Sequence, residues 1–201
     1  MGGKWISTNQ KKSMDIFNIP VVLGTARQGR FSEYVARFVH QKFTEHDGID
    51  SKLIDIRDHT YTITTPPWGV GGANEKKTQW KEIIENADAL VIVTPEYNHG
   101  YPGELKLLLD SLYDEYEKKP VALCGVSAGG LGGAHVVEHL KQVLIEFKMV
   151  PIRNAVYFSN VKDLFTENGT IKDASYGERI DEMLKELLWY AQALKDGRKN
   201  K

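Results

Sequence analysis

The sequence predicts an α/β protein built on a doubly wound parallel sheet. Two observations carry this prediction. Five short apolar runs, rich in β-branched residues, alternate with five segments whose apolar residues recur at helical spacing. Most of these runs also end at turn-forming residues. Parallel strands need crossover connections, and helical crossovers pack back onto the sheet with one hand, so the alternation predicts helices on both faces.

The first half of the chain supplies two strands and two helices. Residues 19–23 form a continuous apolar run that stops at Gly24, as expected for a strand buried on both faces. Residues 52–56 are the second predicted strand. The first helix is indicated by Val35, Phe38, Val39 and Phe43, and the second by Trp80, Ile83, Ile84 and Ala87.

The second half continues the alternation. Residues 89–93 give the clearest buried strand, and Thr94-Pro95 ends it because proline cannot extend a central ladder. Residues 120–126 and 154–158 are the fourth and fifth predicted strands. Three more helices are indicated by leucine-rich stripes: Leu105, Leu108, Leu109 and Leu112; Val137, Leu140, Leu144 and Phe147; and Ile180, Leu184, Leu187, Leu188 and Ala191.

Length and composition indicate one domain. With 201 residues, 41% of them hydrophobic, we expect a single domain over 18–195, with a flexible segment at 1–17 and a flexible tail at 196–201. The net charge of −1 gives no field that would attract nucleic acid or an anionic membrane. One cysteine, Cys124, permits no internal disulfide, and the N-terminal residues lack the apolar stretch of a signal peptide. We therefore expect a cytoplasmic protein.

The loop after the first strand has the features of an anion site. It joins a strand to the predicted N-terminus of a helix, where free backbone N–H groups and the helix dipole attract negative charge. Thr25 and Ser32 add hydroxyls, Gly29 permits close approach, and Arg27 and Arg30 offer guanidinium groups. Because two arginines oppose the dipole until an anion joins them, we expect them to bind phosphate and to contribute little to folding. A solvated basic loop is the alternative.

Two further loops follow the third and fourth predicted strands. Residues 94–103 hold two tyrosines and Asn98, whose amide can donate and accept hydrogen bonds to a planar heterocycle. Residues 125–133 contain five glycines, which permit positive φ and close approach of a flat ligand. An ordinary strand-to-helix turn and simple flexibility remain alternatives for these loops.

Together these three loops resemble the NADPH-dependent FMN reductase family, which includes flavin, quinone, azo-dye and chromate reductases. The resemblance rests on Gly24-Thr-x-Arg27, Pro95-Glu-Tyr-Asn98 and Ser127-Ala-Gly-Gly130, and it spans about residues 18 to 160. It implies a flavodoxin-like fold with five strands in the order 2-1-3-4-5. Many relatives carry serine then asparagine where this chain has Arg30 and Ser32. The loop around Trp68 matches no pattern of the family.

The resemblance also implies a set of cofactor-binding residues. The FMN phosphate and ribityl chain would be held by Thr25, Arg27, Arg30, Phe31 and Ser32. The isoalloxazine ring would lie against Pro95, Glu96, Tyr97 and Asn98, with Ser127, Ala128, Gly129 and Gly130 at its other edge. Members of the family pair through the third helix, so we expect a homodimer or homotetramer, with Leu107 on its free face.

The implied activity is hydride transfer from NADPH or NADH through FMN to a small acceptor such as a quinone, a flavin, an azo compound or a metal oxyanion. The flavin performs the redox chemistry, so no side chain need act as an acid, a base or a nucleophile. Ping-pong kinetics would follow. The alternatives are a flavodoxin-type electron carrier, which the nearly neutral charge disfavours, and a flavin-based redox sensor.

One motif points to different chemistry. His135-Val-Val-Glu138-His139 fits the pattern of inverted zinc peptidases. A catalytic zinc ion also needs a third ligand and a cleft, and the pattern supplies neither. We therefore predict a solvated helix face and no metal site.

Overall fold

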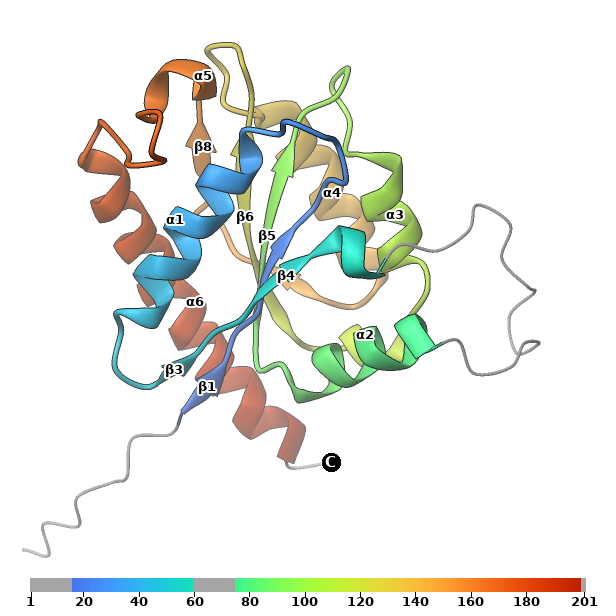
Figure 1. Ribbon diagram of the computed structural model, residues 1–201. Coiled ribbons are helices and arrows are strands. Elements are labelled where there is room, and N and C mark those ends of the chain that lie inside the picture. The colour runs from blue at the N-terminus through green and yellow to red at the C-terminus, as the bar shows by residue number, and fades with distance from the viewer. Residues whose placement is uncertain (1–15, 60–74, 200–201) are drawn as a thin grey trace, which may run out of the picture.

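The computed structural model describes residues 16–59 and 75–199, and it shows the doubly wound α/β fold (Figure 1). The main sheet contains β4 (Leu53–Asp55), β2 (Val21–Leu23), β5 (Leu90–Pro95), β6 (Pro120–Val126) and β7 (Val150–Pro151) in that order, with β8 (Val156–Phe158) also paired to β6. A small second sheet joins β1 (Phe17–Asn18) and β3 (Ile49–Asp50). Every strand pair in both sheets is parallel.

Helices cover both faces of the main sheet. The long helix α6 (Ser175–Lys199) and α1 (Ser32–Thr44) lie on one face, while α2 (Glu75–Asn86), α3 (Gly103–Leu109) and α4 (Ala134–Glu146) lie on the other (Figure 1). Three short helical segments connect these elements: η1 (Ile56–His59), η2 (Asp114–Tyr116) and α5 (Val161–Leu164). None of the helices in the described part of the chain is long and apolar enough to cross a membrane.

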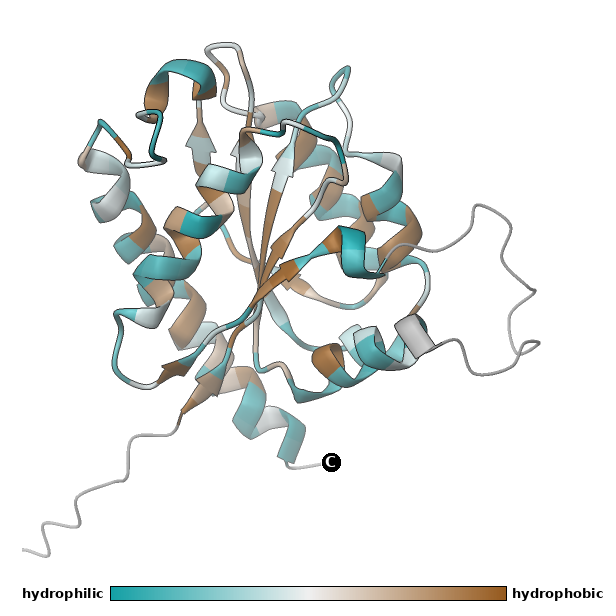
Figure 2. Ribbon diagram, viewed as in Figure 1, coloured by the Kyte–Doolittle hydropathy of each residue, from teal (hydrophilic) through white to brown (hydrophobic). Residues whose placement is uncertain are grey.

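Alternation along the strands divides the core in two. On β5, Val91 and Val93 pack toward α1 and α6, whereas Leu90 and Ile92 pack toward the opposite three helices. Both sets are fully buried, which explains why the central strands are apolar throughout (Figure 2). Burying each such side chain stabilises the fold by about 1.5–3 kcal/mol relative to leaving it exposed.

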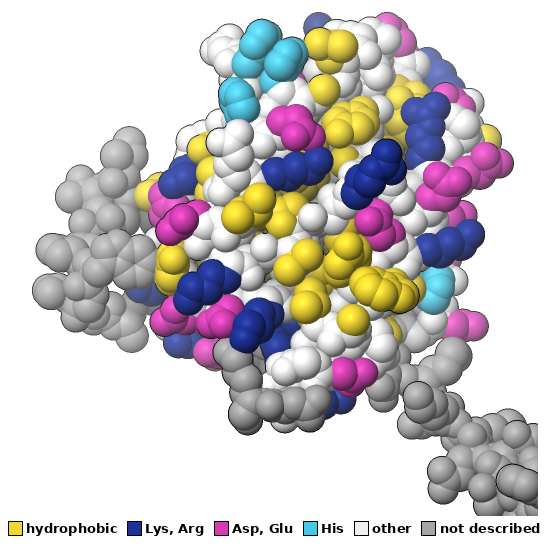
Figure 3. Space-filling model, turned by 180° about the vertical axis from the view of Figure 1, so that it is seen from behind, with side chains coloured by type: hydrophobic (Ala, Val, Ile, Leu, Met, Phe, Trp, Pro, Cys, Tyr) yellow, Lys and Arg dark blue, Asp and Glu magenta, His cyan; other side chains and the backbone are white. Residues whose placement is uncertain are grey.

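The surface carries charges of both signs side by side (Figure 3). This mixture agrees with the net charge of −1 and leaves the face shown without an extended patch of one sign.

The structure corrects several expected boundaries. Five strands were predicted, but the described residues form eight, because β1, β3 and β7 are additional. The third predicted strand does not stop before Thr94-Pro95, since β5 pairs with β6 as far as Pro95, and the fifth shortens to β8. The N-terminal segment already enters the small sheet at Phe17. Helix α6 continues to Lys199, beyond residue 195, because Lys195 and Arg198 both contact the Asp88 carboxylate, at 2.9 and 3.8 Å. The loop around Trp68 lies outside the described residues.

Candidate functional site

Three loops meet at the carboxyl edge of the sheet, where ligands bind in doubly wound folds (Figure 1). We call residues 24–31 the first loop, 96–102 the second loop and 127–133 the third loop. Backbone hydrogen bonds tie each loop's start to the next strand: the Gly24 N–H donates to the Val93 carbonyl (2.8 Å), the Glu96 N–H to Val126 (2.9 Å) and the Ser127 N–H to Phe158 (3.1 Å). The three loops therefore share one rigid base.

Thr25 connects the first loop to the second loop and to α3. Its hydroxyl is fully buried, donates to Glu104 Oε1 (3.0 Å) and lies 3.0 Å from the Tyr97 hydroxyl. The Ala26 N–H donates to the same Glu104 oxygen (2.9 Å). Thr25 thus positions the loops. Glu104, in the first turn of α3, is thus a structural centre of the site.

The two predicted phosphate ligands of the first loop lie in different surroundings. The Arg27 side chain is exposed, and its guanidinium carbon lies 5.5 Å from the centre of the Tyr97 ring. The Arg30 side chain is buried, and its guanidinium donates to the Thr25 carbonyl and to the Asp55 carboxylate. Arg30 therefore fastens the first loop to the end of β4, and its position gives no support to the expected phosphate contact.

The two neighbouring arginines change the pKa of the Asp55 carboxyl. Burial by itself raises the pKa of the Asp55 carboxyl, but hydrogen bonds from Arg57 and Arg30 outweigh that effect and lower the pKa to about 2. The carboxylate is thus charged at neutral pH, and it neutralises the buried Arg30 guanidinium.

The N-terminus of α1 offers unsatisfied polar groups. Ser32, the first residue of α1, is only 2% exposed, and among the described residues its hydroxyl has no hydrogen-bond partner. The preceding residue, Phe31, makes no side-chain cap bond and is 37% exposed. Gly29 has φ +67°, a conformation that glycine adopts without strain, and the space beside its Cα is open. An anion at this position would accept a hydrogen bond from the Ser32 hydroxyl and would lie at the positive end of the α1 dipole.

The second loop is a tight hairpin. The Tyr97 and Gly100 N–H groups donate to one another's carbonyls, at 2.9 and 3.0 Å, across the two turn residues Asn98 and His99. Both turn residues have positive φ, +50° and +65°. The Asn98 side chain is exposed and Pro95 is half-buried at the end of β5, so both remain accessible to a ligand.

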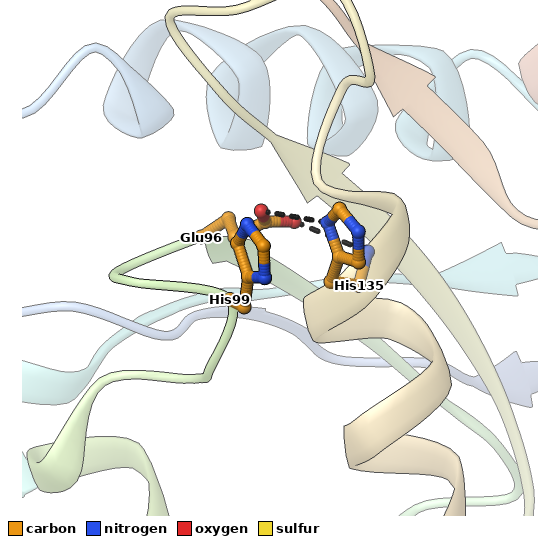
Figure 4. A group of neighbouring side chains, drawn as sticks. All are labelled: Glu96, His99 and His135. Atoms are coloured by element: carbon orange, nitrogen blue, oxygen red, sulfur yellow. Dashed lines mark hydrogen bonds and ion pairs between the residues drawn. The ribbon is translucent and has the colours of Figure 1, made fainter.

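The Glu96 side chain is turned to the start of α4, and the contact that the family resemblance implies for Glu96 is one through its main chain. Its Oε2 accepts hydrogen bonds from the His135 and Val136 N–H groups at the start of α4, at 3.1 and 3.3 Å, and its Oε1 lies 3.0 Å from His135 Nδ1 (Figure 4). The positive end of the α4 dipole attracts the carboxylate. The His99 ring stacks on the His135 ring, with centres 4.0 Å apart and planes 6° apart.

The glycines of the third loop serve two purposes. Gly132 (φ +61°) and Gly133 (φ +86°) lie so close to the sheet that a Cβ would come within 2.7 Å of Tyr157 or of the Val126 nitrogen. Gly129 and Gly130 have open space around them, and with Ala128 they are exposed. The Ser127 hydroxyl donates to the Gly129 carbonyl (2.9 Å) and holds this open stretch in place.

The His135–Glu138–His139 pattern forms no joint ligand set. Glu138 is exposed and pairs with Lys141 (2.8 Å), and the His139 side chain is also exposed. His135 instead joins Glu96 and His99, whose ligand atoms all lie within 4.8 Å of one another. No sequence pattern predicts this trio, because Glu96 and His99 come from the second loop and His135 from α4, which only the fold brings together.

Comparisons with known proteins identify the family of the chain. Residues 17–163 match the family model for NADPH-dependent FMN reductase. The chain is 34% identical to an NAD(P)H-dependent FMN reductase of Schizosaccharomyces pombe over 136 residues, covering 65% of this chain and 67% of the relative. It is 26% identical to a quinone reductase of Pseudomonas putida, covering 79% and 86%.

Among solved structures, the fold is similar to that of FerB, a flavoenzyme NAD(P)H:(acceptor) oxidoreductase from Paracoccus denitrificans. The TM-score is 0.74 at 22% identity, and the match covers 87% of this chain and 99% of FerB. The chain therefore belongs to the NADPH-dependent FMN reductase family and is an FMN-dependent NAD(P)H reductase.

Proposed function

We propose that this reductase passes electrons from NADPH or NADH to a quinone, and that the three loops at the carboxyl edge of the sheet hold the FMN. The observation that carries the binding mode is the buried hydroxyl of Ser32, which finds no partner among the described residues and lies at the N-terminus of α1. A buried polar group without a partner costs about 1–3 kcal/mol, so a ligand oxygen at this point would be strongly favoured.

The first loop holds the phosphate. Ser32 donates its hydroxyl, the α1 N-terminus supplies N–H groups, and the Arg27 guanidinium can swing onto the phosphate from the solvent side. Gly29 and the exposed Phe31 let the ribityl chain run close to the backbone. Thr25 and Arg30 do not contact the phosphate in this proposal; they hold the first loop in place through Glu104 and Asp55.

The second and third loops enclose the ring. Pro95, Tyr97 and Asn98 present main chain and the Asn98 amide on one side, and Ala128, Gly129 and Gly130 form an open, flat surface on the other. Ser127 fixes that surface, and Glu96 fixes the second loop to α4. The fit favours a planar ligand that approaches bare backbone.

Bound FMN would supply the redox chemistry for hydride transfer from the nicotinamide to the acceptor. The protein's part is to bind, to orient and to exclude competing groups, so no side chain is assigned as a catalytic acid or base. A quinone is the acceptor we favour because it is planar and small enough to follow the nicotinamide onto the same face. The relative named quinone reductase supports this choice.

The purified protein tests the proposal directly. Acid should release FMN and not FAD, NADPH or NADH should bleach the bound flavin within minutes under anaerobic conditions, and a quinone should restore the colour. Bleaching without reoxidation by quinones would refute the acceptor, and failure of both nucleotides would favour a carrier or sensor. Ser32→Ala should weaken FMN binding while the apo-protein keeps or gains stability, since the variant removes an unsatisfied hydroxyl.

We also propose a homodimer or homotetramer that works in the cytoplasm. Leu107 on α3 is half-buried, although Leu105, Leu108 and Leu109 of the same helix are fully buried in the core. A second copy of the chain would cover its remaining surface.

A further inference from the structure

We propose that Glu96, His99 and His135 bind one divalent transition-metal ion, of the kind that prefers imidazole nitrogen, such as Zn²⁺. The three side chains come from the hairpin of the second loop and from the first turn of α4, and they lie side by side, with the His99 and His135 rings stacked (Figure 4). Their ligand atoms lie within 4.8 Å of one another. This site is separate from the phosphate site at the N-terminus of α1.

The distances suit a common ion. Zn²⁺ binds histidine nitrogen and carboxylate oxygen at about 2.0–2.2 Å, so two neighbouring ligand atoms on one ion lie about 3 Å apart. Glu96 Oε1 and His135 Nδ1 lie 3.0 Å apart. The His99 ring already stacks on the His135 ring and is exposed, so a rotation of this one side chain brings its nitrogen onto the same ion.

Glu96 is preorganised for this role. Its Oε2 is held by the His135 and Val136 N–H groups, and this leaves Oε1 directed at the histidines. The carboxylate can therefore keep the cap of α4 with one oxygen and bind an ion with the other. In the tautomer of His135 that carries its proton on Nε2, the Nδ1 lone pair is free for the metal.

The backbone conformation of His99 is a further observation in favour of a metal-binding role. Its φ of +65° occupies the second position of a two-residue hairpin turn, where glycine is the residue of lowest cost. A residue with a Cβ in this left-handed conformation costs about 1–2 kcal/mol. Histidine therefore stands where the turn alone would favour glycine.

The ligand set selects the class of ion. Two imidazoles and one carboxylate suit Zn²⁺, Co²⁺, Ni²⁺ or Cu²⁺, whereas Mg²⁺ and Ca²⁺ prefer oxygen ligands throughout. Because three protein ligands leave at least one position open and His99 is exposed, a water molecule would complete the coordination.

The test uses untagged, FMN-loaded protein that has been treated with a chelator and dialysed, with Zn²⁺ titrated by calorimetry. We expect one ion per chain, and at least tenfold weaker binding in His99→Gly and in His135→Ala. His139→Ala, one helical turn further along α4, is the matched control and should bind as the wild type does. Co²⁺ should give a visible d–d absorption band that His99→Gly abolishes.

His99→Gly separates metal binding from folding. Glycine suits the positive φ, so this variant should melt at the same temperature as the wild type or higher without metal, and it should lose the rise of about 5 °C that a hundredfold excess of Zn²⁺ over Kd gives the wild type. Glu96→Gln keeps an oxygen for the α4 cap but loses the charge, so it should weaken Zn²⁺ binding while the fold is retained. Equal Zn²⁺ binding by wild type and the His99→Gly/His135→Ala double variant would overturn the site and leave Glu96 as a helix cap alone.

Discussion

At the scale of single residues, Arg27 and Arg30 lie three positions apart but have different surroundings and different roles. Arg27 and Arg30 look equivalent in the sequence, because both lie in a basic loop ahead of a helix. The fold separates them: Arg30 is turned inward to Asp55, a partner 25 residues away, and Arg27 is left on the surface above Tyr97. Periodicity and loop position predicted the anion site, but the partner of Arg30 depends on pairing between β2 and β4, which no local pattern reveals.

Arg27→Ala should therefore weaken FMN binding by about ten- to a hundredfold, because a charge-assisted hydrogen bond to phosphate contributes about 1.5–3 kcal/mol. Riboflavin, which lacks the phosphate, should bind both proteins equally. Fluorescence titrations with the two flavins measure the difference. An equal loss of riboflavin and FMN affinity would show that Arg27 shapes the loop and does not bind phosphate.

Asp55→Asn should destabilise the protein by about 1–3 kcal/mol at pH 7, because the buried Arg30 guanidinium loses its counter-charge. The Asp55 pKa of about 2 lies below its ordinary value of 3.8, so the wild type's advantage is fully present above about pH 4 and disappears as the pH falls toward 2.

Urea unfolding of wild type and Asp55→Asn between pH 7 and 2.5 measures this advantage. Asp58→Asn, an exposed carboxylate in the same segment, is the control and should leave stability within about 0.5 kcal/mol. A difference between wild type and Asp55→Asn that stays constant over this range would contradict the ion pair.

At the scale of elements, the helices and central strands were predictable, and the loop connections were not. Local periodicity predicted the apolar stripes of α1, α4 and α6 and the apolar runs of β5 and β6. The residues of these elements that are buried in the core are therefore the ones expected from the sequence. The cap of α4 was missed because Glu96 lies 39 residues before His135. The four glycines of the third loop likewise suggested one flexible stretch in the sequence, although two of them pack tightly and two are open.

This division gives a matched pair of variants. Gly132→Ala should destabilise the protein by about 2–4 kcal/mol, because a Cβ there meets Tyr157 at 2.7 Å and φ is +61°. Gly130→Ala should change stability by no more than about 0.5 kcal/mol but should weaken FMN binding, since its new methyl group occupies the open surface. Thermal melts and FMN titrations separate the two effects, and equal destabilisation by both variants would show that the loop packs differently.

At the scale of the whole molecule, the expected assembly depends on α3. If a second copy covers Leu107, Leu107→Arg should raise the dimer dissociation constant at least tenfold, because an arginine buried at the interface would lack a partner. Light scattering from nanomolar to micromolar concentration gives the measurement. Trp189→Arg, at a 67% exposed position of α6 on the opposite face of the sheet, is the control and should leave the assembly intact. A monomeric wild type at micromolar concentration would refute the proposal.

The parallel sheet also gives the molecule two unlike ends. All three loops lie at the carboxyl edge, whereas β1 and the last turn of α6, anchored through Asp88, lie at the opposite edge (Figure 1). If FMN binds at the three loops as proposed, a support attached beyond the end of α6 would leave the flavin facing solution. An anchor near α5 or the hairpin would instead obstruct the approach of the nicotinamide and the acceptor.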